Sequence, residues 1–496
     1  MSGESKLNDL SDSSPLSVMS DISRQDPTPT YHIATLGCEK NGVDSEGMAA
    51  LLDEAGYRAA GAPEADLLIV NTCGFLHAAT DQSVGVLEDL DRGRRPGQLL
   101  IAAGCAAHRY GDELKDRVPG IDGLLSTRQW PEIVKLADHL RRGGTVTAAP
   151  GAGAVISVES LLAGGTSVAG APLAPVQPAA QLKRFRRKAQ GASAYVKISE
   201  GCDHKCAFCI IPAIRGRHVS RPIAELVAEV RDLTAQGVQE CLLIAQDSTY
   251  YGVDLGLRDG LAALLAAICT EAPALRWLRL MYAYPTQVTP ALIETMARYP
   301  QICRYIDMPL QHAHPEVLRR MKRPNDMARV RRLQAEFRAA MPDIALRTTF
   351  IVGFPGETDA EFQTLLDFLR EIEFDHVGMF TYSPEEGTPA AALPDQVPDR
   401  IKQRRYREAM QLQQAIATRK NRRRVGQRLD VLLEGTGTLE DGRGRTVPIF
   451  AGRYDRQAPE VDGMVFVHAR PGLAPGQIVP VRIVESTEYD LWAKPL

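Results

Sequence analysis

The stretch Glu200-Gly-Cys-Asp-His-Lys-Cys-Ala-Phe-Cys-Ile-Ile-Pro212 places three cysteines in a C-x3-C-x2-C spacing, and the rest of the chain is interpreted from it. A [4Fe-4S] cluster usually takes four cysteine ligands. Three thiolates therefore leave one iron open, and an open coordination position is what a catalytic metal site needs. Cys202, Cys206 and Cys209 are the candidate ligands and the candidate catalytic centre.

Two other interpretations of these cysteines are weaker. A zinc site needs a fourth ligand such as His204 or His218, but structural zinc sites usually pair two short cysteine motifs, and no second pair follows in this sequence. A disulfide does not fit an odd number of cysteines in a chain that looks cytosolic. The spacing therefore favours an iron–sulfur cluster.

Outward from this motif, the middle of the chain alternates short apolar runs with helical patterns. The runs predict strands at 195–199, 242–245, 277–281, 305–309, 346–352 and 376–381. The helical patterns lie at 223–235, 261–271, 291–297, 315–321, 327–340 and 360–371. Six such units predict a curved parallel sheet with outer helices, short of the eight units of a closed TIM barrel. The cysteine motif follows the first strand, at the edge where barrel chemistry takes place.

Three more cysteines stand just after apolar runs near the N-terminus. The runs 31–36, 67–71 and 99–103 predict parallel strands that are buried on both faces. They are followed by Cys38, Cys73 and Cys105, respectively. Because loops after parallel strands gather at one edge of a sheet, we expect the three thiols to converge. Buried structural cysteines are the alternative, but the same position after three strands favours a second metal site with three ligands.

Composition divides the chain into five segments. The expected segments are a disordered tail (1–30), an N-terminal parallel α/β domain (31–142), a linker (143–187), a central core (188–426) and a small all-β module (427–496). The uncharged run 160–181 is rich in Gly, Pro, Ser and Ala, which indicates a linker and not a membrane span. With no apolar leader in the tail, the cytoplasm is the expected location.

Charge gives no general indication of nucleic-acid binding. The chain has 496 residues and a formal net charge of -3. Two basic segments, Lys183–Lys188 and the helical pattern 398–426, are expected to be solvated, with RNA contact as the second interpretation. Nine cysteines in a chain of this length are not a disulfide framework. Cys241, Cys269 and Cys303 lie in no motif and are expected to be buried and inert.

The cysteine segment resembles that of the radical S-adenosylmethionine (SAM) superfamily, whose partial (β/α)6 barrel also fits the six predicted units. The resemblance implies that the open iron chelates the amino and carboxylate groups of SAM. An electron from the cluster then splits SAM into methionine and a 5'-deoxyadenosyl radical.

This resemblance implies further cofactor contacts. Phe208 would pack the cluster against the barrel, and Gln246 and Asp247 would hydrogen-bond the methionine end of SAM. For Asp247, an ordinary helix cap is an equally good interpretation. After the fifth strand, Arg347 would pair with a carboxylate. Gly353 and Gly356 would let the backbone approach the adenosyl group.

The whole chain after the tail resembles the radical SAM methylthiotransferase family. The matching segments are Thr35–Glu46, Asn71–Gly74, Gly104-Cys105 and Tyr195–Arg217, and the last module resembles a TRAM domain. The resemblance implies two [4Fe-4S] clusters, the first on Cys38, Cys73 and Cys105 and the second, which binds SAM, on Cys202, Cys206 and Cys209. Family members attach a methylthio group to a C–H carbon and use SAM both as methyl donor and as radical source.

The branch of the family sets the expected substrate. One branch modifies the β-carbon of an aspartate in ribosomal protein uS12, and another modifies an adenosine in tRNA. Four segments resemble the protein-modifying branch, namely Leu36–Asn41, Lys197–Cys206, Ile244–Gly252 and Arg456–Gly463. Glu39 departs from it, since proline is more usual there. Residues 428–496 contain eight Lys and Arg and ten Asp and Glu, and this acidic balance suits a basic ribosomal protein better than RNA.

The expected partners follow from this branch. They are uS12, free or in the small subunit, an electron donor such as flavodoxin or ferredoxin, and a sulfur donor. The protein itself is expected to be a monomer without membrane contact. The alternatives are a tRNA adenosine methylthiotransferase and a non-catalytic iron–sulfur protein that binds RNA.

Overall fold

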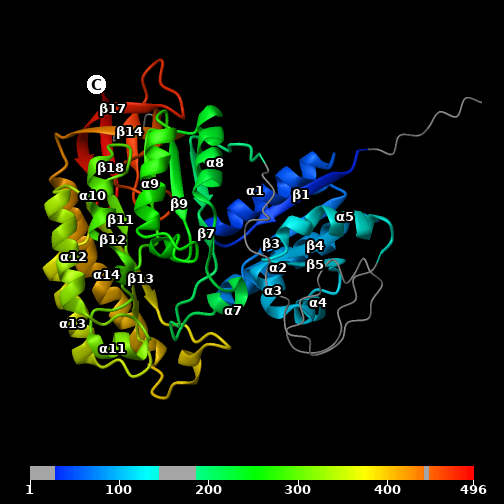
Figure 1. Ribbon diagram of the computed structural model, residues 1–496, viewed down its shortest axis with the longest axis horizontal. Coiled ribbons are helices and arrows are strands. Elements are labelled where there is room, and N and C mark those ends of the chain that lie inside the picture. The colour runs from blue at the N-terminus through cyan, green and yellow to red at the C-terminus, as the bar shows by residue number, and fades with distance from the viewer. Residues whose placement is uncertain (1–27, 145–185, 441–445) are drawn as a thin grey trace, which may run out of the picture.

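The computed structural model describes residues 28–144, 186–440 and 446–496. They form three folded parts, which Figure 1 shows as an N-terminal part in blue and cyan, a central part from green to orange, and a small C-terminal module in orange-red. Most of the expected tail and most of the expected linker lie outside the described residues.

The N-terminal part is a five-stranded parallel sheet in the order β2-β1-β3-β4-β5. Its strands are β1 (Thr30–Thr35), β2 (Arg58–Ala59), β3 (Leu67–Thr72), β4 (Leu99–Gly104) and β5 (Gly123–Ser126). Its helices are α1 (Glu39–Glu54), α2 (His77–Gly93), α3 (Cys105–Tyr110), α4 (Asp112–Arg117) and α5 (Ile133–Arg141). Alternate residues of β3 belong to two different apolar clusters, so both faces of the sheet are covered, as its continuous apolar run predicts.

The central part contains the six predicted parallel strands. They are β6 (Ser193–Lys197), β9 (Glu240–Ile244), β10 (Trp277–Leu280), β11 (Tyr305–Asp307), β12 (Ala345–Val352) and β13 (His376–Thr381). The strands form two groups of three, β6-β9-β10 and β11-β12-β13. The groups are joined through a bridge between Leu278 and Ile302. This arrangement is the predicted partial barrel.

Helices cover the outside of this barrel, and short elements follow its first strand. The outer helices are α8 (Ile223–Ala235), α9 (Gly260–Glu271), α10 (Pro290–Arg298), α11 (Pro315–Arg320), α12 (Met327–Ala340) and α13 (Asp359–Ile372). The ribbon of β7 (Ser199–Glu200) and β8 (Val219–Ser220) encloses the cysteine loop and α7 (Ile211–Arg215). The predicted motif therefore lies after the first barrel strand.

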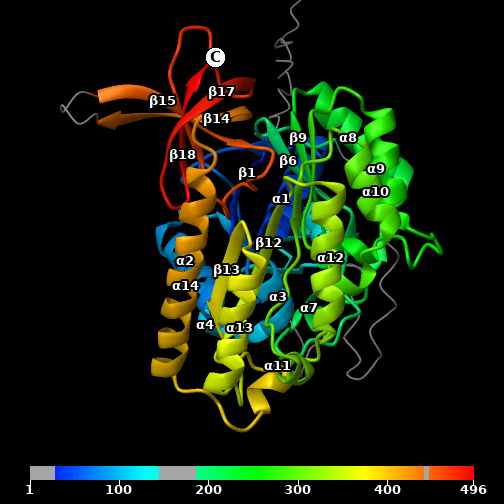
Figure 2. The ribbon, with the colours of Figure 1, turned by 90° about the vertical axis from the view of Figure 1, so that its left-hand side faces the viewer.

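The C-terminal module is a closed five-stranded barrel in the order β14-β15-β16-β18-β17. Its strands are β14 (Arg428–Glu440), β15 (Thr446–Tyr454), β16 (Val465–His468), β17 (Ile478–Ser486) and β18 (Leu491–Pro495). Its core holds residues from all five strands. The all-β prediction is confirmed, and Figure 2 shows the long β14–β15 hairpin projecting from the body of the molecule.

The module packs into one end of the central barrel. Leu432 and Ala458 share an apolar cluster with Trp277 and Tyr305 of the barrel strands. Beside this cluster, Glu240 accepts hydrogen bonds from Arg279 at 2.6 Å and from Arg453 of the module at 2.5 Å. All three charged side chains are buried, so this contact is a core shared by the two parts.

The basic helix α14 (Asp399–Arg422) is docked on the central part (Figure 2). Its cations pair with carboxylates of that part: Arg404 and Arg405 with Asp359, Arg419 with Glu373, and Lys420 with Asp375. The expectation of a solvated segment is wrong for the buried Arg405 and the largely buried Lys420, while Arg404 and Arg419 are exposed and agree with it. No helix among the described residues is both long and apolar enough to cross a membrane.

The described end of the other basic segment is also paired. Arg187 is buried, and its guanidinium lies 2.8 Å from both Glu46 of α1 and Glu229 of α8. Lys188 pairs with Asp53 of α1 at 2.6 Å. These residues therefore join the N-terminal part to the barrel.

Candidate active site between two cysteine loops

The barrel cysteine site consists of Cys202, Cys206 and Cys209, in the loop between β7 and α7. All three thiols are free and partly accessible. Burial raises the pKa of Cys202 to about 11 and that of Cys209 to about 12. Because metal binding requires thiolates, a bound metal would have to displace these protons.

A glycine is required where this loop begins. Gly201 has a φ of +77°, and a Cβ there would lie 2.0 Å from the carbonyl oxygen of Arg217. The amide of Cys202 donates to the carbonyl of Gly216 at 3.0 Å. The first cysteine is thus held against the backbone that returns from α7.

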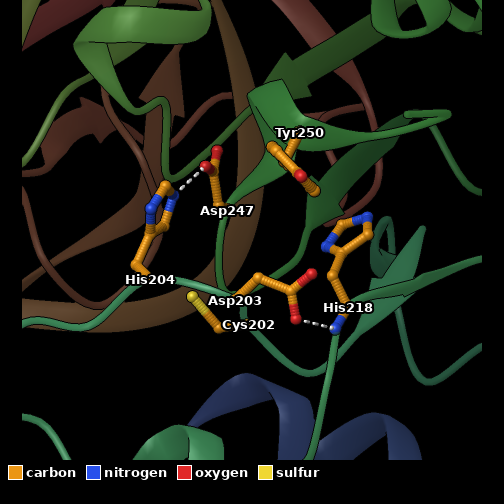
Figure 3. Close-up of a pocket in the computed structure, with 6 residues that line it drawn as sticks. All are labelled: Cys202, Asp203, His204, His218, Asp247 and Tyr250. Carbon is orange, nitrogen blue, oxygen red and sulfur yellow. Dashed lines mark hydrogen bonds and ion pairs between the residues drawn. The ribbon is translucent and has the colours of Figure 1, made fainter. Parts of the chain in front are cut away.

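A cavity of about 100 Å³ lies beside the barrel cysteine site (Figure 3). It is lined by Cys202, Asp203, His204, His218, Asp247 and Tyr250. The His204 ring lies 2.6 Å from the Asp247 carboxylate and stacks on Tyr284, with 3.8 Å between ring centroids. Two imidazoles and two carboxylates therefore lie around the cavity next to the first cysteine.

Gln246 and Asp247 lie beside this loop, as the sequence predicted. Gln246 donates to Glu200 at 3.1 Å, while its amide oxygen is buried and has no partner among the described residues. Asp247 accepts from the amide of Thr249 at 2.9 Å, so the helix-capping interpretation is correct for one carboxylate oxygen. The other oxygen faces His204. The unpartnered amide oxygen of Gln246 is a suitable acceptor for a ligand amino group.

The residues predicted after the fifth strand have partners within the protein. Arg347 lies 2.7 Å from Asp307 and 3.5 Å from Asp462 of the C-terminal module. A Cβ at Gly353 would lie 2.3 Å from Lys402 of α14. A Cβ at Gly356 would lie 3.6 Å from the side chain of Arg320. In the cysteine loop, Phe208 packs against the barrel core. The cofactor roles of these four residues stay predictions.

The outer cysteine site consists of Cys38, Cys73 and Cys105, which follow the neighbouring strands β1, β3 and β4. Burial raises the pKa of Cys73 and of Cys105, and the charge of Cys38 raises both further. The loops that carry them are close in space, since a Cβ at Gly37 would lie 3.0 Å from Sγ of Cys73, and Sγ of Cys105 lies 3.8 Å from the side-chain oxygen of Asn41. A cluster shared by the three thiols stays a prediction. Among the described residues, no group of three His, Cys, Asp or Glu side chains is close enough to hold a single metal ion. The ligands of a four-iron cluster lie further apart than those of a single ion.

Asn41 holds the outer loops together, and sequence reasoning did not single it out. Its side-chain amide nitrogen donates to the backbone carbonyls of Leu36 and Thr72 at 2.9 and 3.0 Å. Its backbone carbonyl accepts from the side-chain amide of Asn71 at 2.8 Å. Asn41 lies in the opening motif beside Cys38, but only the fold reveals that it joins two cysteine loops.

The two cysteine sites meet where α3 packs against α7 (Figure 1). Cys105 is the first residue of α3, and α7 follows Cys209 after one residue. From the N-terminal part, Arg128 donates to the carbonyls of Ala213 and Ile214, both at 3.1 Å. The interface therefore brings the ends of both cysteine loops together.

Buried charges complete this interface. Lys197 of β6 is bonded to Asp44 of α1 and lies 2.6 Å from Glu200. Arg215 of α7 lies 2.9 Å from Glu200 and 3.5 Å from Asp44. Burial opposes ionisation of Glu200, but the nearby Arg215 and Lys197 cations hold its pKa well below the usual range. Sequence patterns gave no indication of these pairs, because their members come from different parts of the fold.

Comparisons with known proteins agree with this architecture. Residues 196–369 match the radical SAM superfamily, residues 30–126 match the uncharacterized protein family UPF0004, and residues 425–496 match the TRAM domain. A solved radical S-adenosylmethionine methyltransferase, TsrM from Kitasatospora setae, has the same fold with a TM-score of 0.54 at 15% identity. The alignment covers 73% of this chain and 74% of TsrM.

Closer relatives cover nearly the whole chain. The ribosomal protein uS12 methylthiotransferase RimO of Chloroflexus aurantiacus is 50% identical over 94% of this chain and 99% of its own length. The RimO protein of Roseiflexus sp. is also 50% identical, over 94% of this chain and 96% of its own length. This similarity includes all three folded parts, so the chain belongs to the RimO family of radical SAM methylthiotransferases.

Proposed function

We propose that this protein transfers a methylthio group to the β-carbon of an aspartate side chain in ribosomal protein uS12. The observation that carries the proposal is the contact between α3, which begins at Cys105, and α7, which follows Cys209, in a chain that is half identical to uS12 methylthiotransferases. Radical chemistry suits an unactivated C–H bond. The acidic C-terminal module suits a basic ribosomal protein.

The donor sets fit two [4Fe-4S] clusters. Each site offers three free thiols, one short of the usual four. We assign a first cluster to Cys38, Cys73 and Cys105, and a second, which binds SAM, to Cys202, Cys206 and Cys209. The second cluster, when bound with SAM and reduced, supplies a radical able to remove hydrogen from carbon.

The chain's own residues would bind and orient the cofactor. Gln246 can accept a hydrogen bond from the SAM amino group through its unpartnered oxygen. The Asp247 carboxylate orients His204 at the wall of the cavity. The charged pairs Lys197–Asp44 and Arg215–Asp44 connect the central part to α1 of the N-terminal part. They would therefore hold the two cysteine sites at a fixed separation and so set how far a substrate carbon lies from each site.

The remaining partners follow from this chemistry. The reaction needs an electron donor such as flavodoxin or ferredoxin and a source of sulfur for the outer site. The substrate is uS12, free or in the small ribosomal subunit, and its location implies the cytoplasm. We propose that a monomer suffices, because both cysteine sites belong to one chain.

Variants of single cysteines test this division of labour. Purified protein is reconstituted with iron and sulfide without oxygen, and then given SAM, a reductant and either uS12 or bulk tRNA. Cys206→Ala should abolish SAM cleavage. Cys73→Ala should keep cleavage and lose methylthiolation of uS12, because it removes only an outer ligand. Mass spectrometry of uS12 and detection of 5'-deoxyadenosine measure the two steps.

Cys269→Ala is the matched control, because Cys269 is buried in α9 and belongs to neither site. It should keep both steps. Methylthiolated tRNA with unmodified uS12 would overturn the substrate assignment. Loss of both activities in Cys73→Ala would overturn the separate roles of the two sites.

A further inference from the structure

Arg215 connects the barrel cysteine loop to a sulfur of the outer site. It is the last residue of α7, yet its guanidinium donates to Sγ of Cys105 in the N-terminal part at 3.5 Å. The same nitrogen donates to the Asn41 side-chain carbonyl at 2.7 Å. Arg215 is only 3% exposed, so these bonds are shielded from water.

The direction of this guanidinium is fixed from both parts of the molecule. Its other terminal nitrogen lies 2.9 Å from Glu200 and 3.5 Å from Asp44. Lys197 is bonded to both of these carboxylates, so the buried charges are compensated. Because the guanidinium is planar and its donors have a fixed geometry, holding one edge also aims the edge that faces Cys105.

We propose that Arg215 is a positioning residue of the outer cysteine site, whose hydrogen bond to the Cys105 thiolate raises the reduction potential of the cluster held there. The proposal rests on the proposed function, which assigns a cluster to Cys38, Cys73 and Cys105. Hydrogen bonds to ligand sulfurs and nearby charge tune the potentials of iron–sulfur clusters. A cation that donates to a thiolate favours the reduced state, because that state carries one more negative charge.

The origin of Arg215 gives this bond a second consequence. The residue belongs to the helix that directly follows Cys209, so the outer potential depends on correct docking of the barrel loop. The reduction potential of the outer cluster is therefore raised only when the N-terminal part and the barrel are packed together.

The test isolates the outer cluster in the full-length chain. Replacing Cys202, Cys206 and Cys209 by alanine leaves only the outer ligands. Iron and sulfide content is measured first, and the midpoint potential is then determined by a reductive titration followed by electron paramagnetic resonance. In this background Arg215→Lys keeps the positive charge but is too short to donate to Cys105 as arginine does.

Arg215→Lys should lower the reduction equilibrium constant of the cluster at least tenfold, a shift of about 59 mV to more negative potential for one electron. Arg128→Lys is the matched control. Arg128 lies in the same interface and donates to carbonyl oxygens of α7. Lysine at this position keeps the positive charge and a donor for these carbonyls, and it leaves the bond between Arg215 and Cys105 in place. Its midpoint potential should equal that of the parent.

Glu200→Gln gives a second test with the opposite sign. It keeps an acceptor for Arg215 but removes a negative charge beside the guanidinium, so the potential should become more positive. This variant decides the question if Arg215→Lys fails to fold.

The outcomes separate the two proposals. A parent with three intact outer cysteines that binds no iron would overturn the cluster assignment itself. A parent with full iron whose potential is unmoved by Arg215→Lys, or moved negative by Glu200→Gln, would overturn the role of Arg215 alone.

Discussion

Gly37 determines how closely the loops of the outer cysteine site can approach each other. Its φ is +92°, and an added Cβ would lie 2.8 Å from Cβ and 3.0 Å from Sγ of Cys73. A side chain at this position would therefore both strain the backbone and push a predicted ligand away. The short loop between β1 and α1 leaves little room for either to relax.

Gly37→Ala should therefore cost the protein its outer cluster and leave the barrel cluster in place. The backbone strain contributes about 1–3 kcal/mol, and the contact with Cys73 adds to it. Iron and sulfide analysis after reconstitution measures the loss, and SAM cleavage reports the intact barrel site.

Gly42→Ala is the control for this substitution. Gly42 lies in α1, where an added Cβ meets no heavy atom within 4 Å. Alanine should stabilise the helix by about 0.5–1 kcal/mol and keep all the iron. Full iron in Gly37→Ala would show that the loops can separate without harm.

Single residues differ in how well the sequence revealed them. The positions of Cys38 and Cys105 after parallel strands were predicted correctly, because an apolar run followed by a cysteine is visible in the sequence. Their role as cluster ligands stays a prediction. Arg347 was expected to pair with a carboxylate, but a sequence does not tell whether that carboxylate belongs to a ligand or to the protein. In the structure, Arg347 pairs with Asp307 and Asp462. Arg215 and Asn41 were missed because their roles arise only when distant segments meet.

At the scale of elements, apolar runs predicted the strands well where both faces are buried. The run 67–71 became β3 (Leu67–Thr72), which is buried throughout. The run 305–309 became only β11 (Tyr305–Asp307), at the place where the sheet is interrupted beside β10. Backbone pairing between strands decides such an interruption, and side-chain pattern does not record it.

Buried charges at strand positions were also invisible to pattern. Glu240 begins β9, and a carboxylate there would ordinarily be expected in solvent. It is instead enclosed by Arg279 of β10 and Arg453 of β15. Burial opposes its ionisation, but the two arginines lower its pKa from 4.5 to about 2.

This lowered pKa predicts how stability depends on pH. Because the folded pKa lies below the unfolded one, the contribution of Glu240 is complete above pH 4.5 and is lost as pH falls toward 2. Glu240→Gln should cost about 3–5 kcal/mol at pH 7, since it leaves two buried arginines without their carboxylate. The difference between wild type and variant should shrink below pH 4.5.

Urea unfolding of both proteins at several pH values measures this difference. Both are studied without iron, so that acid loss of the clusters does not contribute. A difference that stays constant from pH 7 to pH 3 would mean that Glu240 keeps an ordinary pKa in the folded protein.

At the scale of the whole molecule, the three folded parts are joined by buried contacts. The C-terminal module shares an apolar cluster and the Glu240 charges with the barrel. The N-terminal part is held by buried pairs such as Lys197 with Asp44. Composition suggested separate domains, because segments rich in Gly and Pro indicate where one domain ends along the chain. They do not indicate how tightly the neighbouring domains pack against each other.

The three tryptophans test whether the barrel and the module unfold as one unit. Trp277 lies in the shared apolar cluster, and Trp492 lies on β18 against Phe466, with 4.7 Å between ring centroids. Two proteins, each with only one of these tryptophans and phenylalanine at the other two positions, should have the same urea midpoint by fluorescence, because cooperative units give coincident transitions.

Ile483→Ala makes the test directional. Ile483 is buried in the module's own core, away from the shared cluster, and its loss should cost about 2–5 kcal/mol. If the module and barrel are coupled, this change lowers the midpoint seen by Trp277 as much as that seen by Trp492. If only the Trp492 transition moved, the module would unfold alone, and the buried contacts around Glu240 would be too weak to join the two parts into one cooperative structure.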